Sequence, residues 1–167
     1  LFAADLFNEG LDLPDVDTVI IPMGGGGLIS GIATPIKETR PSVRVVGAEP
    51  ALTPKYYHSR LNKQRTTLPL RNTIADGLRI SVPGQNPYPI IERYVDEIVL
   101  VEDEHIVQGM RALAKDAKLI AEPAAAIGIG ALLAGVVKLR PDEKVCVVLT
   151  GGNWDLGDLA EVYGAAE

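Results

Sequence analysis

Cysteine, aromatic residues and basic charge are all scarce in this sequence of 167 residues. Cys146 is the only cysteine, which excludes a disulfide framework within the chain and a metal cluster built on cysteines. Aromatic residues make up 5% of the chain, too few for a platform that stacks nucleic-acid bases. The formal net charge is −6, which argues against binding to nucleic acid or to an anionic membrane surface, because both require a basic face.

Long hydrophobic runs and targeting signals are also lacking. No apolar run is long enough for a bilayer-spanning helix, and the first residues do not form a secretory signal, so we expect a cytoplasmic location. Hydrophobic residues make up 47% of the chain, which is sufficient for one core, and we expect residues 1–167 to form a single α/β domain. Residues 1–10 resemble the last turns of a helix with no capping residue before them, so the domain is expected to be truncated at its N-terminus.

Short apolar runs alternate with helical patterns along the chain. Strands are predicted at residues 18–23, 43–48, 97–101 and 144–149, and all are expected to be buried. Helices are predicted at residues 28–40, 55–62, 87–94, 103–118 and 123–139, with Asp103 as the cap of the fourth. This alternation predicts an α/β fold of three layers, in which a mainly parallel sheet has helices on both faces.

Four consecutive glycines, Gly24 to Gly27, follow the first predicted strand directly. Because glycine has no Cβ, the backbone N–H groups of such a loop can turn toward one point, and the next helix directs its positive end there. The loop therefore predicts a phosphate-binding site that needs no basic side chain. A tight turn with close helix packing is the alternative, although four glycines would be entropically costly for that purpose alone.

The strict nucleotide-binding patterns are not met by this loop. A dinucleotide fingerprint requires a third glycine at the sixth place, where this chain has Ser30 or Ile29, and no Gly-Lys-Ser/Thr sequence follows as in a P-loop. Glu49, at the end of the next predicted strand, is nevertheless placed like a ribose-binding acid. On spacing alone, a dinucleotide-binding domain remains an alternative.

Five motifs in order resemble those of the fold-type II pyridoxal-phosphate enzymes, and within that family those of threonine and serine dehydratases (ammonia-lyases) and serine racemases. They are Gly24-Gly25-Gly26-Gly27-Leu28-Ile29-Ser30-Gly31, Val46-Gly47-Ala48-Glu49-Pro50, Thr73-Ile74-Ala75-Asp76-Gly77, Glu122-Pro123-Ala124-Ala125-Ala126 and Leu149-Thr150-Gly151-Gly152-Asn153. A single glycine loop would be weak evidence, whereas an ordered series over nearly the whole chain is specific.

The resemblance implies pyridoxal 5'-phosphate as the cofactor, with its phosphate group held by the backbone of Gly24, Gly25, Gly26, Gly27 and Leu28. It also implies that Thr150 faces the pyridine nitrogen, although a helix cap or a turn is an alternative role for this residue. Glu122 is either an active-site acid or an acid that favours the start of a helix. The other cofactor contacts that the resemblance implies are Asp76, Gly77, Gly151, Gly152 and Asn153.

The resemblance further implies parts that this chain lacks. Members of the family carry the Schiff-base lysine in a Ser-x-Lys segment well before the glycine loop, and no lysine of this chain lies in such a segment. We expect each lysine here to be a solvated helix or loop residue. The small domain that contacts the substrate carboxylate is not represented either. The chain is therefore predicted to be the C-terminal half of the enzyme, inactive without the missing N-terminal half or a partner chain.

A divalent cation site is the other family feature that the sequence matches only in part. Some members bind the cation through a glutamate, a carbonyl four residues later and an aspartate two residues further. Glu49 and Thr53 match the first two positions, but Lys55 replaces the aspartate and its ammonium group disfavours a cation, so no metal site is predicted. His58 and His105 form no zinc-binding pattern.

The resulting prediction is a threonine/serine dehydratase-like ammonia-lyase that converts a hydroxy amino acid to a 2-oxo acid and ammonia. Its partners would be a small amino-acid substrate and further copies of the protein in a homo-oligomer. A serine racemase-like activity, a non-catalytic module that binds a phosphorylated ligand or serves in assembly, and a dinucleotide-binding domain remain alternatives.

Overall fold

Four parallel strands form one sheet in the computed structural model, which describes residues 16–164. The strands are β1 (Thr18–Pro22), β2 (Arg44–Pro50), β3 (Glu97–Val101) and β4 (Val145–Val147), in the spatial order β3-β2-β1-β4. The chain first adds β2 and β3 on one side of β1 and then crosses back to add β4 on the other side. In parallel α/β sheets, such a reversal of strand order creates a crevice at the carboxyl ends of the strands.

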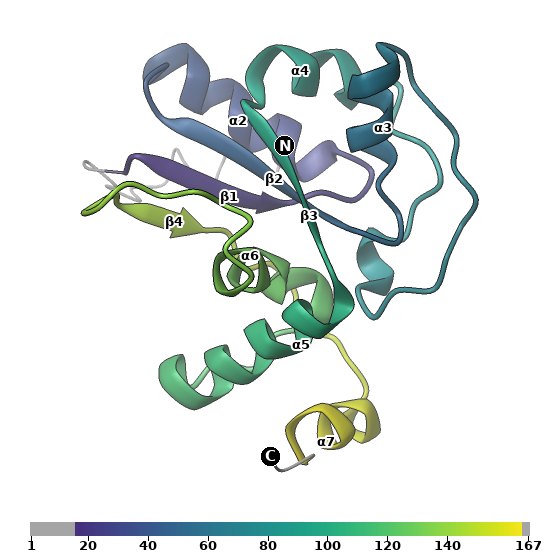
Figure 1. The fold of residues 1–167 in the computed structure, drawn as a ribbon, viewed down its shortest axis with the longest axis vertical. Helices are drawn as coiled ribbons and strands as arrows, with labels where there is room; N and C mark the ends of the chain where they lie inside the picture. Colours follow the sequence, from purple (N-terminus) through teal and green to yellow (C-terminus); the bar gives the residue numbers. More distant parts are fainter. Residues whose placement is uncertain (1–15, 165–167) are drawn as a thin grey trace.

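Helices cover both faces of this sheet (Figure 1). Helices α2 (Gly27–Thr39) and α4 (Pro87–Tyr94) pack on one face, and α5 (Asp103–Ala112) and α6 (Pro123–Leu133) lie on the other. Alternate residues of β1 enter opposite cores: Val19 and Ile21 pack with α2, whereas Ile20 packs with α6. The predicted three-layer α/β fold is thus confirmed.

Three elements have the predicted bounds, namely α3 (Lys55–Asn62), α4 and β3. The two helices after β3 are shorter than predicted: α5 ends at Ala112 and continues as one π-helical stretch, η2 (Leu113–Ala117), whereas α6 ends at Leu133. A short 3-10 helix, η1 (Asp76–Leu78), lies in the long segment between α3 and α4, and α7 (Leu156–Gly164) follows β4. The helix predicted within residues 1–10 lies outside the described residues.

Two predictions about side chains are wrong. Asp103 does not cap α5, because the N-cap residue is Glu102 and the Asp103 carboxylate instead accepts hydrogen bonds from Thr73 Oγ1 (2.6 Å) and Ile74 N (2.9 Å). Strand β4 is half-buried rather than buried, and so is Cys146 within it, since β4 lies at an edge of the sheet. Burial still raises the pKa of the Cys146 thiol.

Close backbone contact joins the two helices on the second face. A Cβ at Gly109 of α5 would lie 2.7 Å from the backbone nitrogen of Gly130, and one at Gly130 would lie 2.6 Å from the carbonyl of His105. Because backbone atoms cannot move aside, only glycine allows α5 and α6 to approach this closely. The Ala- and Gly-rich sequence of α6 therefore allows it to pack tightly against α5.

The carboxylate of Glu143 stabilises the amino end of the sheet. Glu143, with 4% of its side chain exposed, accepts hydrogen bonds from Arg140 N (2.8 Å) and Thr18 Oγ1 (2.5 Å). These bonds lower the pKa of Glu143 to about 2, and the bond from the backbone N–H of Arg140 has the largest effect.

Within residues 16–164, no helix has the length and apolar character needed to cross a bilayer.

Candidate functional site

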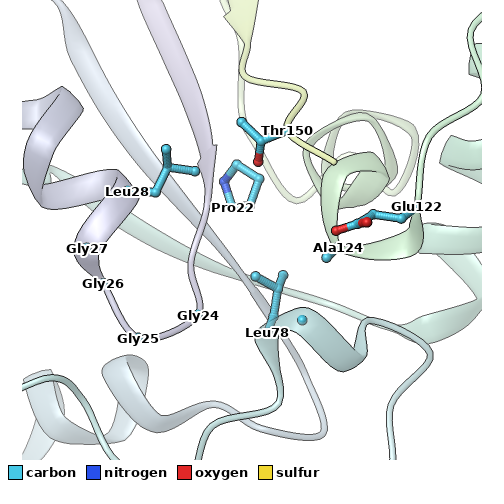
Figure 2. Close-up of a pocket in the computed structure, with 11 residues that line it drawn as sticks. Pro22, Gly24, Gly25, Gly26, Gly27, Leu28, Leu78, Glu122, Ala124 and Thr150 are labelled. Atoms are coloured by element: carbon cyan, nitrogen blue, oxygen red, sulfur yellow. The ribbon is translucent and has the colours of Figure 1, made fainter. Parts of the chain in front are cut away.

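A cavity of about 220 Å³ lies at the carboxyl ends of β1 and β4, where the strand order reverses (Figure 2). Six segments meet there: the end of β1, the glycine loop, the start of α2, η1, the start of α6 and the residues after β4. The lining residues are Pro22, Gly24, Gly25, Gly26, Gly27, Leu28, Gly77, Leu78, Glu122, Ala124 and Thr150. The fold therefore brings together motifs that lie far apart in the chain, from the first glycine loop to the residues after the last strand.

The glycine loop turns its backbone toward this cavity. No described residue accepts a hydrogen bond from the backbone N–H groups of Gly24 to Gly27. Helix α2 begins at Gly27, so its positive N-terminal end lies at the same place. Free N–H groups at a helix N-terminus are the donors that bind phosphate groups in proteins, and none of the described residues that line the cavity is basic.

Packing explains only two of the four glycines. Gly26 has a φ of +97°, and a Cβ there would lie 2.1 Å from the Tyr56 hydroxyl, while a Cβ at Gly24 would lie 3.2 Å from the Gly77 carbonyl. At Gly25 and Gly27, by contrast, a Cβ would meet no atom within 4 Å, and both residues are exposed. The protein itself thus gives no packing reason for glycine at these two positions, whereas a ligand close to the backbone would.

Thr150 and Glu122 lie across the cavity from the glycine loop (Figure 2). Thr150 follows β4 and is half-buried. Glu122 is the N-cap residue of α6, but its carboxylate makes no capping bond and instead accepts a hydrogen bond from Asn153 N (3.1 Å). Glu122 thus lies both at the N-terminus of α6, where its charge is favourable to the helix dipole, and on the wall of the cavity, so both of its predicted roles stay open.

The other predicted site residues border the cavity without lining it. Asp76 is exposed, and its carboxylate accepts a hydrogen bond from the N–H of Gly77, which does line the cavity. Gly151 has a φ of +102° and packs against Glu122, since a Cβ at Gly151 would lie 2.4 Å from the Glu122 carboxylate. Gly152 and Asn153 are exposed and continue this segment.

Lys55 contradicts the expectation that every lysine is solvated. Its side chain is fully buried, and its ammonium nitrogen lies 2.9 Å from Glu49 Oε1. Glu49 is also fully buried, and its carboxylate further accepts hydrogen bonds from the backbone N–H groups of Tyr56 and Tyr57, both at 3.0 Å. Glu49 is thus unavailable for a ribose, which removes the residue that supported a dinucleotide-binding domain.

Lys55 also occupies the third position of the partial metal motif, after Glu49 and Thr53. Lys55 places its ammonium group against the one carboxylate of the motif, Glu49. Thr53 is buried, and its hydroxyl has no hydrogen-bond partner among the described residues. Within residues 16–164, no group of three or more His, Cys, Asp or Glu side chains is arranged to hold a metal ion.

Several residues of the site were not predicted from the sequence. Pro22, Leu78 and Ala124 line the cavity. Leu78 directly follows one recognised motif and Ala124 belongs to another, which is the signal that would have identified them, whereas Pro22 ends the strand two residues before the glycine loop. Tyr56 supports the loop from behind: its hydroxyl donates to Gly25 O (2.8 Å) and accepts from Gly84 N (3.2 Å). Burial raises the pKa of Tyr56 to about 12, so the hydroxyl keeps its proton for this bond.

Known proteins with similar sequences include ammonia-lyases and serine racemases. L-threonine ammonia-lyase from Geobacter sulfurreducens is 44% identical over 151 residues, which cover 90% of this chain and 37% of that protein. Serine racemase from Arabidopsis thaliana is 36% identical over 159 residues, which cover 93% of this chain and 48% of that protein. This chain therefore spans about half the length, or less, of these relatives.

Solved structures agree with the sequences. Maize serine racemase matches with a TM-score of 0.84 at 36% identity, covering 95% of this chain and 48% of that one. Serine racemase from Dictyostelium discoideum matches with a TM-score of 0.80 at 34% identity, covering 92% and 48%. A family model described as "Pyridoxal-phosphate dependent enzyme" matches residues 3–151. The chain accordingly belongs to the family of pyridoxal-phosphate dependent enzymes, as its five motifs had indicated.

Proposed function

We propose that this chain forms the cofactor-binding part of an ammonia-lyase that acts on threonine or serine. The observation that carries the proposal is the glycine loop: its N–H groups have no acceptor among the described residues, and packing does not require glycine at positions 25 and 27. A phosphate group on the open side of the loop accounts for both facts. The similarity to L-threonine ammonia-lyase supports this choice of reaction.

The residues of this chain would bind and orient the cofactor. Gly24 to Gly27 would donate their N–H groups to the phosphate, and the positive end of α2 would add to the attraction. Thr150, on the opposite wall, would offer its hydroxyl to the ring nitrogen, and Glu122 would be held in place by Asn153. Pyridoxal phosphate, when bound, supplies the electron sink for removal of the α-proton and loss of the β-hydroxyl.

The rest of the enzyme would supply the lysine and the substrate-binding domain. Among residues 16–164 no lysine lines the cavity, and Lys55 is buried behind the loop. Leu149 directly precedes the cavity-lining Thr150, and Leu119 and Ile120 shortly precede Glu122; their side chains are 37%, 49% and 57% exposed. We infer that these side chains are covered by the rest of the enzyme or by another copy in a homo-oligomer, because large exposed apolar side chains mark contact surfaces where they gather.

Titration of the chain with pyridoxal phosphate tests the proposal. Absorbance should show saturable binding that inorganic phosphate competes away, and borohydride reduction followed by mass analysis should find no cofactor attached to a lysine. Gly25→Ala and Gly27→Ala should weaken binding by about tenfold or more, since each adds a methyl group where the phosphate would lie. Neither should change the thermal midpoint of unfolding, because neither Cβ meets another atom.

A glycine far from the site provides the matched control. Gly135 lies just after α6 with a φ of +63° and no atom near its Cβ position, and asparagine is the residue that best tolerates this conformation. Gly135→Asn should therefore leave cofactor binding unchanged. Phosphate-independent binding, or equal binding by the Gly25 variant, would refute the proposed site. A cofactor adduct on one lysine of this chain would refute the inference that the lysine lies outside it.

Serine racemisation is the second candidate, because serine racemases match this chain nearly as well as the lyases do. The two activities differ in their products. The complete enzyme incubated with L-serine should release pyruvate and ammonia if elimination dominates, and D-serine, detected by chiral chromatography, if racemisation does. Phosphate-dependent binding without either product in the complete enzyme would instead indicate a non-catalytic binding module.

A further inference from the structure

A buried ammonium group lies directly behind the glycine loop. Lys55 is the first residue of α3, and its nitrogen contacts three oxygen atoms: Glu49 Oε1 at 2.9 Å, Met23 O at 3.2 Å and Leu78 O at 3.4 Å. These oxygens come from three different segments, namely the end of β2, the residue before the glycine loop and the end of η1. One side chain thus ties together three segments that border the site.

Three oxygen atoms surround the Lys55 nitrogen, and two of them are backbone carbonyls that can only accept hydrogen bonds. An ammonium group matches this arrangement, because it has three N–H donors for three acceptors. Burial lowers the pKa of Lys55, whereas the charge and hydrogen bond of Glu49 oppose this change. Glu49 in turn accepts hydrogen bonds at both of its oxygens, from Lys55 and Tyr56 N at Oε1 and from Tyr57 N at Oε2.

The bonds of Lys55 hold the two sides of the cavity together. Met23 directly precedes the first glycine of the loop, and the backbone of Leu78 lies against Gly24, where a Cβ would be 3.4 Å from the Leu78 Cα. The adjoining residue, Tyr56, holds the middle of the loop through its bond to Gly25 O. Lys55 is fully buried, so it acts on the site through the backbone and does not touch a ligand.

We propose that Lys55 is a positioning residue, a cation built into the chain that fixes the glycine loop against η1 and thereby sets the affinity of the site for phosphate. The proposal rests on the proposed function, because it assigns phosphate binding to this loop. A purely structural role makes a different prediction: a buried ion pair can often be replaced by uncharged residues of similar volume without loss of stability.

The double variant Glu49→Gln/Lys55→Met separates the two roles. It removes both charges at nearly constant volume, so it should fold even where Lys55→Met alone, which leaves an unpaired carboxylate, does not. Its affinity for pyridoxal phosphate and for inorganic phosphate should fall by about tenfold or more, the factor that corresponds to one lost charge-assisted hydrogen bond. Wild-type affinity in the double variant would overturn the proposal.

Hydrogen exchange tests the same inference without any cofactor. The Gly84 amide bonds to Gly25 O and to the Tyr56 hydroxyl, so it reports on the loop, whereas the Ala134 amide bonds to Gly130 O at the far end of α6. In the double variant, Gly84 should exchange about tenfold faster while Ala134 stays unchanged. Unchanged Gly84 exchange would overturn the positioning role of Lys55. Absence of phosphate binding by the wild type would overturn the proposed function instead.

A small external cation should also restore the loop. Lys55→Ala leaves a space surrounded by the three oxygens, and methylammonium has the size and the donors to occupy it. Methylammonium chloride should return the phosphate affinity of Lys55→Ala toward that of the wild type, whereas tetramethylammonium chloride, which has no N–H donor, should not. Equal effects of the two salts would contradict the proposal, because they would indicate ionic strength alone.

Discussion

Replacing Gly26 with alanine should destabilise the protein, whereas the same change at Gly25 or Gly27 should not, although the three glycines adjoin in one loop. Gly26 is buried with a φ of +97°, and a Cβ there would lie 2.1 Å from the Tyr56 hydroxyl and 2.8 Å from both Ile91 Cδ1 and Pro87 Cβ. No non-bonded carbon approaches other atoms this closely, so the loop or its three neighbours must move.

The magnitude follows from two separate costs. An alanine forced into a left-handed conformation costs about 1–2 kcal/mol relative to glycine. Inserting a methyl group into a packed site costs about 1–3 kcal/mol in displaced side chains and backbone. Their sum, about 2–5 kcal/mol, is a large part of the roughly 5–15 kcal/mol that stabilises a typical domain. For a protein of this size it corresponds to a fall in the thermal midpoint of about 4–20 °C.

Thermal and urea unfolding, followed by circular dichroism, measure this difference. Gly25→Ala is the matched control, because its Cβ meets no atom within 4 Å and its φ is not in the left-handed region. The free energy of unfolding of the control should stay within about 0.5 kcal/mol of the wild type. If Gly26→Ala unfolds at the same temperature as Gly25→Ala, the contacts of the loop with Tyr56 do not determine its conformation, and the reasoning is refuted.

Two further predictions concern groups on opposite ends of the sheet. Tyr56→Phe removes the hydroxyl that donates to Gly25 O, so it should lower the free energy of unfolding by about 1–2 kcal/mol and weaken phosphate binding. Tyr57→Phe is the control, because Tyr57 is exposed, and it should change neither quantity. Unfolding and phosphate-titration assays measure the two effects. The pKa of Glu143 is lowered from 4.5 to about 2, so its ionised form stabilises the fold above about pH 4.5 and this contribution disappears as the pH falls toward 2. The urea midpoint should therefore decline less between pH 4.5 and 2 in Glu143→Gln than in the wild type, and equal declines would contradict this assignment.

The sequence was sufficient to predict the layered fold because its periodicities are strong and local. The apolar strand at Glu97–Val101 and the helix at Pro87–Tyr94 have the predicted bounds, since a proline starts the helix and polar residues flank the strand. The C-terminal end of α5 was not predicted correctly. The pattern that predicts a helix up to residue 118 does not distinguish α-helical from π-helical hydrogen bonding.

Burial of charged residues was the main feature that the sequence could not predict. Lysine is almost never fully buried unless it is paired, and the partner of Lys55 lies on the preceding strand, where its spacing alone suggested a ribose or a metal. The half-buried state of β4 was missed for a related reason. An apolar run predicts a strand, but its position at the edge of the sheet depends on the crossover after β3, which is a property of the whole topology.

The pairing of Lys55 with Glu49 bears on how the site can attract an anion without a basic side chain. Among the residues that the structure describes, no lysine or arginine lines the cavity, and the chain as a whole carries a net charge of −6. The ammonium of Lys55 is neutralised by Glu49 at 2.9 Å, so the pair adds little net charge to the field at the loop. In the proposed function, the attraction would then come from the N–H groups of the loop and the start of α2, which act only over short distances and in one direction. Affinity that depends on the position of N–H groups would require a rigid loop, and the proposed role of the buried ion pair and the buried tyrosine directly behind the loop is to make it rigid.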